Sequence, residues 1–382
     1  MIYLDHNATT PPAPEVIAAM LPVLSGLWAN ASSQHGPGQQ AKRALSTARA
    51  TVAEVLGCKP VEVIFTSGAT EANHLAVRGL LAASVPARRR VLFGSVEHAG
   101  HLRLARALGD AGVPVDLLPV QRDGTLDLAA AASLIGPDVA LVSLMAANNE
   151  TGVLMPVTEV AALAHAAGAL LHVDATQLIG KLPFDFAGYG ADAVSLSAHK
   201  FHGPKGVGAL LLRLSLPCVP QILGSQERGR RGGTENLAGI VGLAAALALL
   251  GDVRPQAARL ARLRDALESG LTRALPETHI WCRQVPRLAG TSYLRFGQLS
   301  VDVVLQRLDH LGIAASSGAA CASGGSQPSH VLMAMGVPAE EALSAVRFSL
   351  GTSTTPAQIN TLLDALPPLL EPLLHEQALT AP

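Results

Sequence analysis

The stretch "VALVSLMAANNETGVLMPVTEVAALAHAAGALLHVDATQ", residues 139–177, determines the fold class. It contains two apolar, β-rich runs, in residues 139–150 and 169–177. Between them, residues 158–168 have the apolar spacing of a helix packed on a sheet. A strand, a helix and a second strand in this order predict a mostly parallel sheet that is covered by helices on both faces.

The same alternation extends to both sides of this stretch. Further strand-like runs occur at residues 61–68, 90–98, 113–120, 191–200 and 206–213. We therefore predict an α/β fold, with a large, mostly parallel-sheet domain in residues 13–250. Residues 1–12 and 251–382 are assigned to a smaller α+β domain, which a long amphipathic helical pattern after residue 251 would link to the first.

Composition excludes several classes of function. The 382-residue chain has 28 Lys and Arg against 29 Asp and Glu, a net charge of -1, so nothing predicts binding to nucleic acid or to an anionic membrane. The longest apolar run, residues 237–251, is too short for a membrane span and predicts a buried helix. With four scattered cysteines and no signal-peptide pattern, we expect a cytoplasmic protein without an intrinsic metal site.

Polar residues follow several of the predicted strands, where open parallel sheets bind their ligands. Asp174 and Gln177 follow one strand, and Ser197, His199 and Lys200 end another. An isolated Asp at such a place is more often a helix cap. A lysine at the end of a buried strand, however, is costly unless it pairs or loses its charge, and its amine suits a Schiff base.

Two further strand ends complete the pattern. "FTSGATEAN", residues 65–73, is a strand, a turn of small residues and a helix start, which can bind a phosphate or can be an ordinary capped turn. His98 in "VEHAG" can stack on a ring or move protons, or can be a packed interior histidine. A phosphate cradle, a carboxylate for a pyridine nitrogen and an imine-forming lysine are together what pyridoxal 5'-phosphate requires.

Ten motifs extend this interpretation over nearly the whole chain. They are "LDHNATT", "TSGATEAN", "VEHAG", "ANNETGV", "HVDATQ", "SLSAHKFHGPKGVGAL", "QERGRRGGTEN", "SSGAACAS", "PSHVLMAMG" and "VRFSLG". In this order they resemble the cysteine desulfurases, and most closely the NifS-type branch of the class V aminotransferase-like enzymes. The resemblance implies the fold-type I architecture of pyridoxal phosphate-dependent transferases and a homodimer. The chain departs from the usual pattern at His6, Asn7, Ser225 and Gln327.

The resemblance also implies roles for individual residues. Lys200 would form the imine with the cofactor, Asp174 would pair with the ring nitrogen and His98 would stack on the ring and assist proton transfer. The remaining cofactor contacts would come from Ala69, Thr70, Asn149, Gln177, Ser197, His199 and, from the partner subunit, Thr234. Arg347 and Asn149 would orient the substrate; a guanidinium grips a carboxylate in two places, although Arg347 can equally form a structural ion pair.

The implied reaction removes sulfur from L-cysteine, giving alanine and a persulfide on Cys321 for a sulfur-acceptor or iron–sulfur scaffold protein. The persulfide would also make Cys321 a transient iron–sulfur ligand, and the thiolate form of Cys321 would be the nucleophile. The small residues around Cys321 would let its loop swing between cofactor and acceptor. Two alternatives remain: a selenocysteine lyase or aminotransferase of the same fold, and a non-catalytic scaffold protein.

Overall fold

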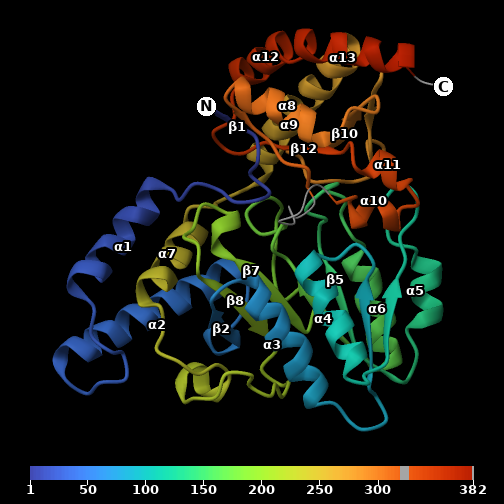
Figure 1. The fold of residues 1–382 in the computed structure, drawn as a ribbon. Coiled ribbons are helices and arrows are strands. Elements are labelled where there is room, and N and C mark those ends of the chain that lie inside the picture. Colours follow the sequence, from blue (N-terminus) through green and yellow to red (C-terminus); the bar gives the residue numbers. More distant parts are fainter. Residues whose placement is uncertain (319–326, 381–382) are drawn as a thin grey trace.

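A seven-stranded sheet forms the centre of the computed structural model, which describes residues 1–318 and 327–380 (Figure 1). The strand order is β2-β8-β7-β6-β5-β3-β4. The bounds are β2 (Val63–Thr66), β3 (Arg90–Gly94), β4 (Val115–Leu118), β5 (Val139–Met145), β6 (Leu170–Asp174), β7 (Ala193–Ser197) and β8 (Gly208–Leu212). All residues of β2, β5, β7 and β8 are buried, as expected for strands that are covered on both faces.

The sheet confirms the predicted mostly parallel arrangement. Strands β4, β3, β5, β6 and β7 are mutually parallel, whereas β8 runs antiparallel to both β7 and β2. Ten residues connect β7 to β8, and they contain only the short helix η2 (Ala198–Lys200). A parallel return needs a longer crossover, so this short connection accounts for the reversed strand.

Helices cover both faces of the sheet. Apolar residues of α3 (Ala69–Ala82) and α4 (Ala99–Asp110) form one core with one face, and those of α2 (Gly36–Leu56), α6 (Val157–Ala167) and α7 (Leu237–Ala248) form another with the opposite face. The remaining helices of this part are α1 (Pro14–Gly26), η1 (Pro60–Glu62), α5 (Leu128–Leu134) and η3 (Gln226–Gly229).

Helix α7 is the buried helix predicted from the apolar run, and among the described residues no helix is long and apolar enough to cross a membrane.

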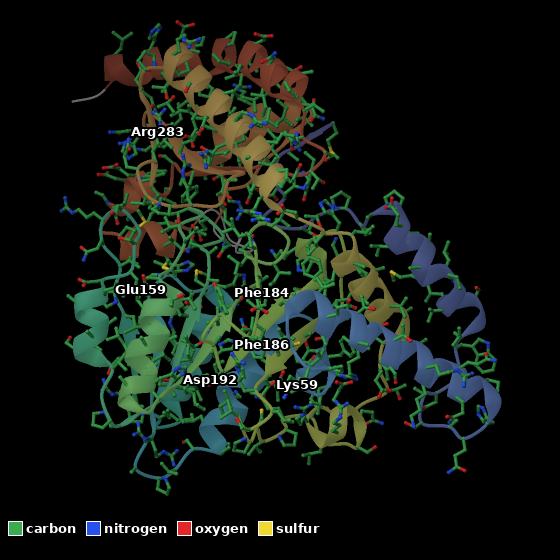
Figure 2. All side chains as sticks on the ribbon, turned by 180° about the vertical axis from the view of Figure 1, so that it is seen from behind. Lys59, Glu159, Phe184, Phe186, Asp192 and Arg283 are labelled. Atoms are coloured by element: carbon green, nitrogen blue, oxygen red, sulfur yellow. The ribbon has the colours of Figure 1, made fainter. Side chains whose placement is uncertain are left out.

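Phe186, labelled in the view from behind (Figure 2), lies fully buried in the loop between β6 and β7. The guanidinium of Arg213 stands 4.4 Å from the centre of its ring, a cation–π contact that holds this loop on the sheet.

A second core lies above the large sheet, at the top of Figure 1. A three-stranded antiparallel sheet in the order β12-β10-β9 and the helices α8, α9, α12 and α13 surround it. The bounds are α8 (Arg254–Ala274), β9 (Thr278–Ile280), β10 (Thr291–Phe296), α9 (Val301–His310), α10 (His330–Ala334), α11 (Ala339–Ala342), β12 (Val346–Ser349), α12 (Pro356–Ala365) and α13 (Pro367–Thr380).

The N-terminal strand belongs to this second part, although the chain continues from it into the large sheet. Strand β1 (Ile2–Tyr3) pairs in parallel with β11 (Ile313–Ala314), and Leu4 is fully buried in the second core. The amide of His6 then donates to the carbonyl of Ser349 at the end of β12. Residues 5–9, which form the N-terminal arm, consequently run between the two cores and reach the carboxyl ends of the large sheet.

Candidate active site

A cavity of about 690 Å³ lies where the carboxyl ends of the parallel strands face the second core. Its walls come from the N-terminal arm, the ends of β5, β6 and β7, the starts of α3 and α4, and the segments next to α10 and β12. Ten residues with predicted site roles line it: Ala69, Thr70, His98, Asn149, Asp174, Gln177, Ser197, His199, Lys200 and Arg347. Sites beyond strand ends are the rule for open parallel sheets.

Lys200 ends the short helix η2, directly after β7. Its Nζ donates to the carbonyl oxygens of Asn7 at 2.6 Å and Ala8 at 2.9 Å. Burial, followed by the nearby charge of Arg347, lowers the pKa of Lys200 from 10.5 to about 8, although Asp174 and Asp5 act in the opposite direction. A lysine with such a pKa supplies a substantial amount of free amine near neutral pH, as an imine-forming residue must.

Asp174 ends β6 and is held by two donors. Asn73 Nδ2 donates to its Oδ2 at 2.7 Å, and the backbone amide of Thr176 donates to its Oδ1 at 2.9 Å. Burial alone would raise the pKa of Asp174, but these hydrogen bonds outweigh burial and hold the pKa below its ordinary value. The site therefore contains a buried, ionised carboxylate, which suits a protonated ring nitrogen.

The start of α3, at one end of the cavity, has the features of a turn that could bind an anion. Gly68 precedes the helix without any capping side chain, so the first amides of the helix, at Ala69 and Thr70, lack a local side-chain acceptor. Ser197, the last residue of β7, lies beside this turn: a Cβ added at Gly68 would be 3.5 Å from the Oγ of Ser197. The amino end of a 14-residue helix with free amides is a good site for a phosphate group.

His98 and His199 line two other parts of the wall. His98 caps α4, where its Nδ1 accepts from the amide of Gly100 at 3.2 Å. Burial lowers the pKa of His98, and that of His199 is lowered to about 4 by burial and by Lys200 and Lys205. Both imidazoles are consequently neutral near pH 7, a state in which each has one donor and one acceptor nitrogen.

Gln177 stands beside the N-terminal arm. Its Nε2 donates to the carbonyl oxygen of Asn7 at 2.9 Å, and its Oε1 accepts from Lys181. Lys181 also donates to Asn7 Oδ1 at 2.7 Å, and burial holds the pKa of this lysine well below its ordinary value. Asn7 thus accepts hydrogen bonds from Gln177, Lys181 and Lys200.

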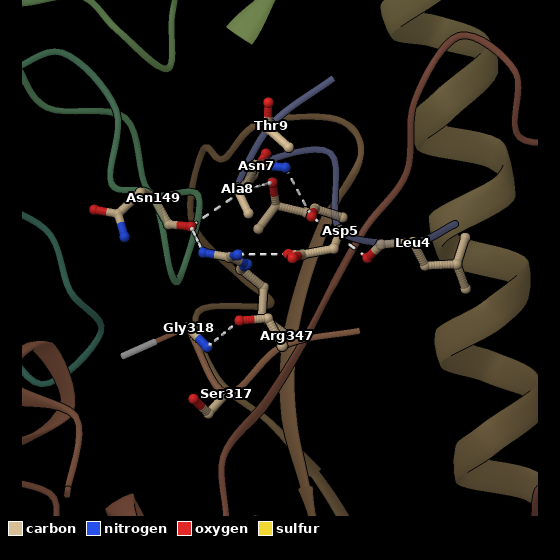
Figure 3. A network of polar contacts seen from close by, with 12 residues as sticks. Leu4, Asp5, Asn7, Ala8, Thr9, Asn149, Ser317, Gly318 and Arg347 are labelled. Carbon is tan, nitrogen blue, oxygen red and sulfur yellow. Dashed lines mark hydrogen bonds and ion pairs between the residues drawn. The ribbon is translucent and has the colours of Figure 1, made fainter. Parts of the chain in front are cut away.

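Arg347 lies at the start of β12 and lines the cavity, and Figure 3 shows its guanidinium between Asp5 and Asn149. Its Nη2 bonds Asp5 Oδ1 at 2.7 Å, and its Nη1 donates to the carbonyl oxygen of Asn149 at 2.8 Å. Its buried Nε has no hydrogen-bond partner among the described residues. The ion pair that the sequence left as an alternative is therefore formed, with an acid of the N-terminal arm, while the guanidinium still faces the cavity.

The structure tests the other two residues singled out in the sequence differently: Thr234 is described and does not line the cavity, whereas Cys321 is not described. Thr234 is exposed in the loop before α7. Cys321 lies outside the described residues, within 319–326.

Sequence reasoning missed several residues of the site. Asn73 is one helical turn after Thr70, and this spacing placed it on the same face of α3. Asn7 and Asp5 carry no local signal, because their partners Lys200 and Arg347 are far away in the chain. The remaining wall residues without an assigned role include Glu150 and His330, which lie in motifs that were recognised only as part of the pattern.

The chain resembles known proteins over nearly its whole length. A family model described as aminotransferase class-V matches residues 2–362. The chain is 50% identical to the cysteine desulfurase of Cereibacter sphaeroides over 377 residues, 97% of this chain and 96% of that protein. It is 43% identical to cysteine desulfurase 2 of Trichormus variabilis, over 98% of this chain and 94% of that protein.

Solved structures show the same relationship. A NifS-like protein superposes with a TM-score of 0.90 at 35% identity, covering 97% of this chain and 99% of that one. A NifS-like protein from Rickettsia africae superposes with a TM-score of 0.87 at 30% identity, again covering 97% and 99%.

Proposed function

The chain belongs to the aminotransferase class-V family, and we propose that it is a pyridoxal phosphate-dependent cysteine desulfurase. The observation that carries the proposal is the convergence of Lys200, Asp174 and the uncapped start of α3 on one cavity. Relatives named cysteine desulfurase, 50% and 43% identical over nearly the full length, support the choice of reaction.

The residues present fit the cofactor. The free amides of Ala69 and Thr70, with Ser197 and His199, would hold its phosphate. The ionised Asp174 would hold its ring nitrogen protonated, and Lys200 would bind its carbonyl carbon. When bound, pyridoxal phosphate supplies an electron sink for the negative charge that develops at the substrate Cα.

Gln177, His98 and Asn149 complete the set of proposed cofactor contacts. Gln177 would turn its amide from Asn7 toward the ring oxygen, and the neutral imidazole of His98 would stack on the ring. Thr234 would reach the phosphate site of the partner subunit in a homodimer, which its exposed position allows.

Proton and substrate handling follow from the same residues. Lys200 Nζ, with a pKa near 8, exchanges protons readily at neutral pH and would move the proton of the substrate Cα, assisted by His98. Arg347 would bind the substrate carboxylate, with Asn149 beside it. Because Arg347 Nη2 is paired with Asp5, the carboxylate must share the guanidinium or displace Asp5.

The sulfur of L-cysteine would pass to the Cys321 thiolate, giving alanine and a Cys321 persulfide. A sulfur-acceptor or iron–sulfur scaffold protein would then take this sulfur. We also propose that residues 13–250 form the cofactor-binding domain, and that residues 1–12 and 251–382 form the small domain that carries the cysteine.

The experiment incubates purified enzyme, reconstituted with pyridoxal phosphate, with L-cysteine and a thiol reductant. We expect stoichiometric alanine and sulfide from the native enzyme, loss of both in Lys200→Ala, and loss of persulfide in Cys321→Ala. Release of a keto acid in place of alanine would favour an aminotransferase, and selenocysteine as the preferred substrate would favour a lyase. A protein that binds no cofactor after reconstitution would refute the proposal and support a scaffold role.

A further inference from the structure

His330, the first residue of α10, lines the active-site cavity and has no role in the function proposed above. One ring nitrogen, Nε2, lies 2.8 Å from the carbonyl oxygen of Glu97. A carbonyl oxygen only accepts hydrogen bonds, so Nε2 must carry a hydrogen in every protonation state that keeps this contact. The other nitrogen, Nδ1, is therefore the one that gains or loses a proton.

Glu150 faces this second nitrogen. Its Oε1 lies 3.9 Å from His330 Nδ1, and its side chain is only 1% exposed. Its Oε2 accepts from the hydroxyl of Ser329 and lies 3.1 Å from the hydroxyl of Tyr293. The orientation of the carboxylate is thus fixed by neighbours, and a positive charge on the imidazole would be stabilised by it.

The same residues contact the chain on both sides of the segment that contains Cys321. The Tyr293 hydroxyl lies 2.9 Å from the carbonyl oxygen of Ser317, and Ser329 is bound to Glu150. Gly318 lines the cavity with a positive φ of 81°, and a Cβ added there would lie 3.1 Å from Glu150 Cγ. His330 and Glu150 therefore lie in the same wall of the cavity as Gly318, the last described residue before 319–326.

Other titratable groups near His330 are poorly suited to accept a proton there. Glu97 is completely buried, and burial raises the pKa of its carboxyl well above the ordinary value, which favours its neutral form. His98 has a lowered pKa and is assigned to the cofactor ring. Its charge interactions include both His330 and Glu150, so the three groups share one electrostatic environment.

We propose that His330 is a second proton-transfer residue of this active site, which accepts the proton of a reacting sulfhydryl group through Nδ1. The S–H bond breaks, its electron pair stays on sulfur as a thiolate, and the proton binds Nδ1, so no oxidant or reductant is needed. Glu150 stabilises the resulting imidazolium, and the Glu97 carbonyl holds the ring in place. This inference rests on the proposed function, which supplies two sulfhydryl sources, Cys321 and the substrate L-cysteine.

The test compares the reconstituted native enzyme with His330→Gln and with the control His310→Gln, which alters an exposed histidine at the end of α9. One arm follows alkylation of Cys321 by iodoacetamide between pH 5.5 and 9, by the mass of its peptide. The other arm follows alanine formation over the same pH range. General base catalysis contributes about 10²- to 10⁴-fold to a reaction rate. We therefore expect His330→Gln to lower the rate by at least about tenfold near pH 7, and this decrease should become smaller as the pH rises.

The two arms separate the two sulfhydryl sources. If the proton comes from Cys321, His330→Gln slows its alkylation at low pH as well as alanine formation. If it comes from the substrate, only alanine formation is slowed. A His330→Gln enzyme that matches the control in both arms at every pH overturns the proposal.

A second variant keeps the test valid if His330→Gln does not fold. If His330→Gln does not retain the cofactor absorbance band, His330→Ala is assayed with and without added imidazole. Recovery of the rate with imidazole supports proton transfer, and a folded His330→Ala with full activity and no response to imidazole refutes it. Native enzyme that forms no alanine would instead refute the proposed function, so the two failures are distinguishable.

Discussion

Replacement of Lys200 by methionine should remove a pH-dependent destabilisation of the cofactor-free protein, whose size the pKa determines. The folded pKa of about 8 lies below the ordinary value of 10.5, so unfolding takes up a proton between these values and stability rises with pH in this window. At about 1.4 kcal/mol per pKa unit, the charged Lys200 costs about 3 kcal/mol at pH 7 and less than about 1 kcal/mol at pH 10. Methionine carries no such charge.

The assay is urea unfolding of native and Lys200→Met proteins, both without cofactor, at half-unit steps from pH 7 to pH 10. The difference between the two unfolding free energies should change by about 2 to 3 kcal/mol across this range, in favour of the native protein at higher pH. Lost hydrogen bonds to Asn7 and Ala8 add a constant that does not depend on pH. A difference that stays constant from pH 7 to pH 10 would show that burial does not depress this amine and would refute the reasoning.

Two further substitutions test the supports of the sheet and the site. Arg49 and Glu227 form a buried ion pair with two hydrogen bonds of 2.6 and 2.7 Å. Arg49→Met should lower the free energy of unfolding in urea by about 3–5 kcal/mol, because Glu227 stays buried without its ion-pair partner. The double variant with Glu227→Gln should recover part of this stability. Asn73→Ala removes one of the donors that keep Asp174 ionised, so the pKa of Asp174 should rise. The affinity for pyridoxal phosphate, measured by absorbance titration, should then fall by about tenfold. An unchanged affinity would contradict the role of Asn73.

The sequence predicted those parts of the site that depend on local pattern. Lys200 and Asp174 could be identified because each follows a strand, and parallel strands bring their carboxyl ends to one edge. The mostly parallel sheet followed from the same alternation. The reversal of β8 could also have been predicted, because only residues 201–205 separate the two strand-like runs, too few for a parallel crossover.

The missed part of the site depends on contacts between distant segments. The Asp5–Arg347 pair joins residues 342 positions apart, and nothing near either residue specifies the other. Depressed pKa values could not be predicted from residue type either, because Lys200 and Lys181 owe them first to burial and then to nearby charges such as that of Arg347, which is distant in the chain. Physical reasoning on sequence therefore reaches the residues of single elements more readily than the pairs that tertiary packing creates.

The position of the N-terminal arm has a consequence for synthesis on the ribosome. The large sheet can collapse once its strands have emerged, but Asp5 has no guanidinium and β1 has no neighbouring strand until residues 313–347 have been made. Strand β1 and Asp5 must therefore wait for these partners through most of translation, and the part of the cavity wall that Arg347 provides is missing during that time. Cofactor loading should accordingly be a late event, which follows release of the chain rather than accompanying its growth.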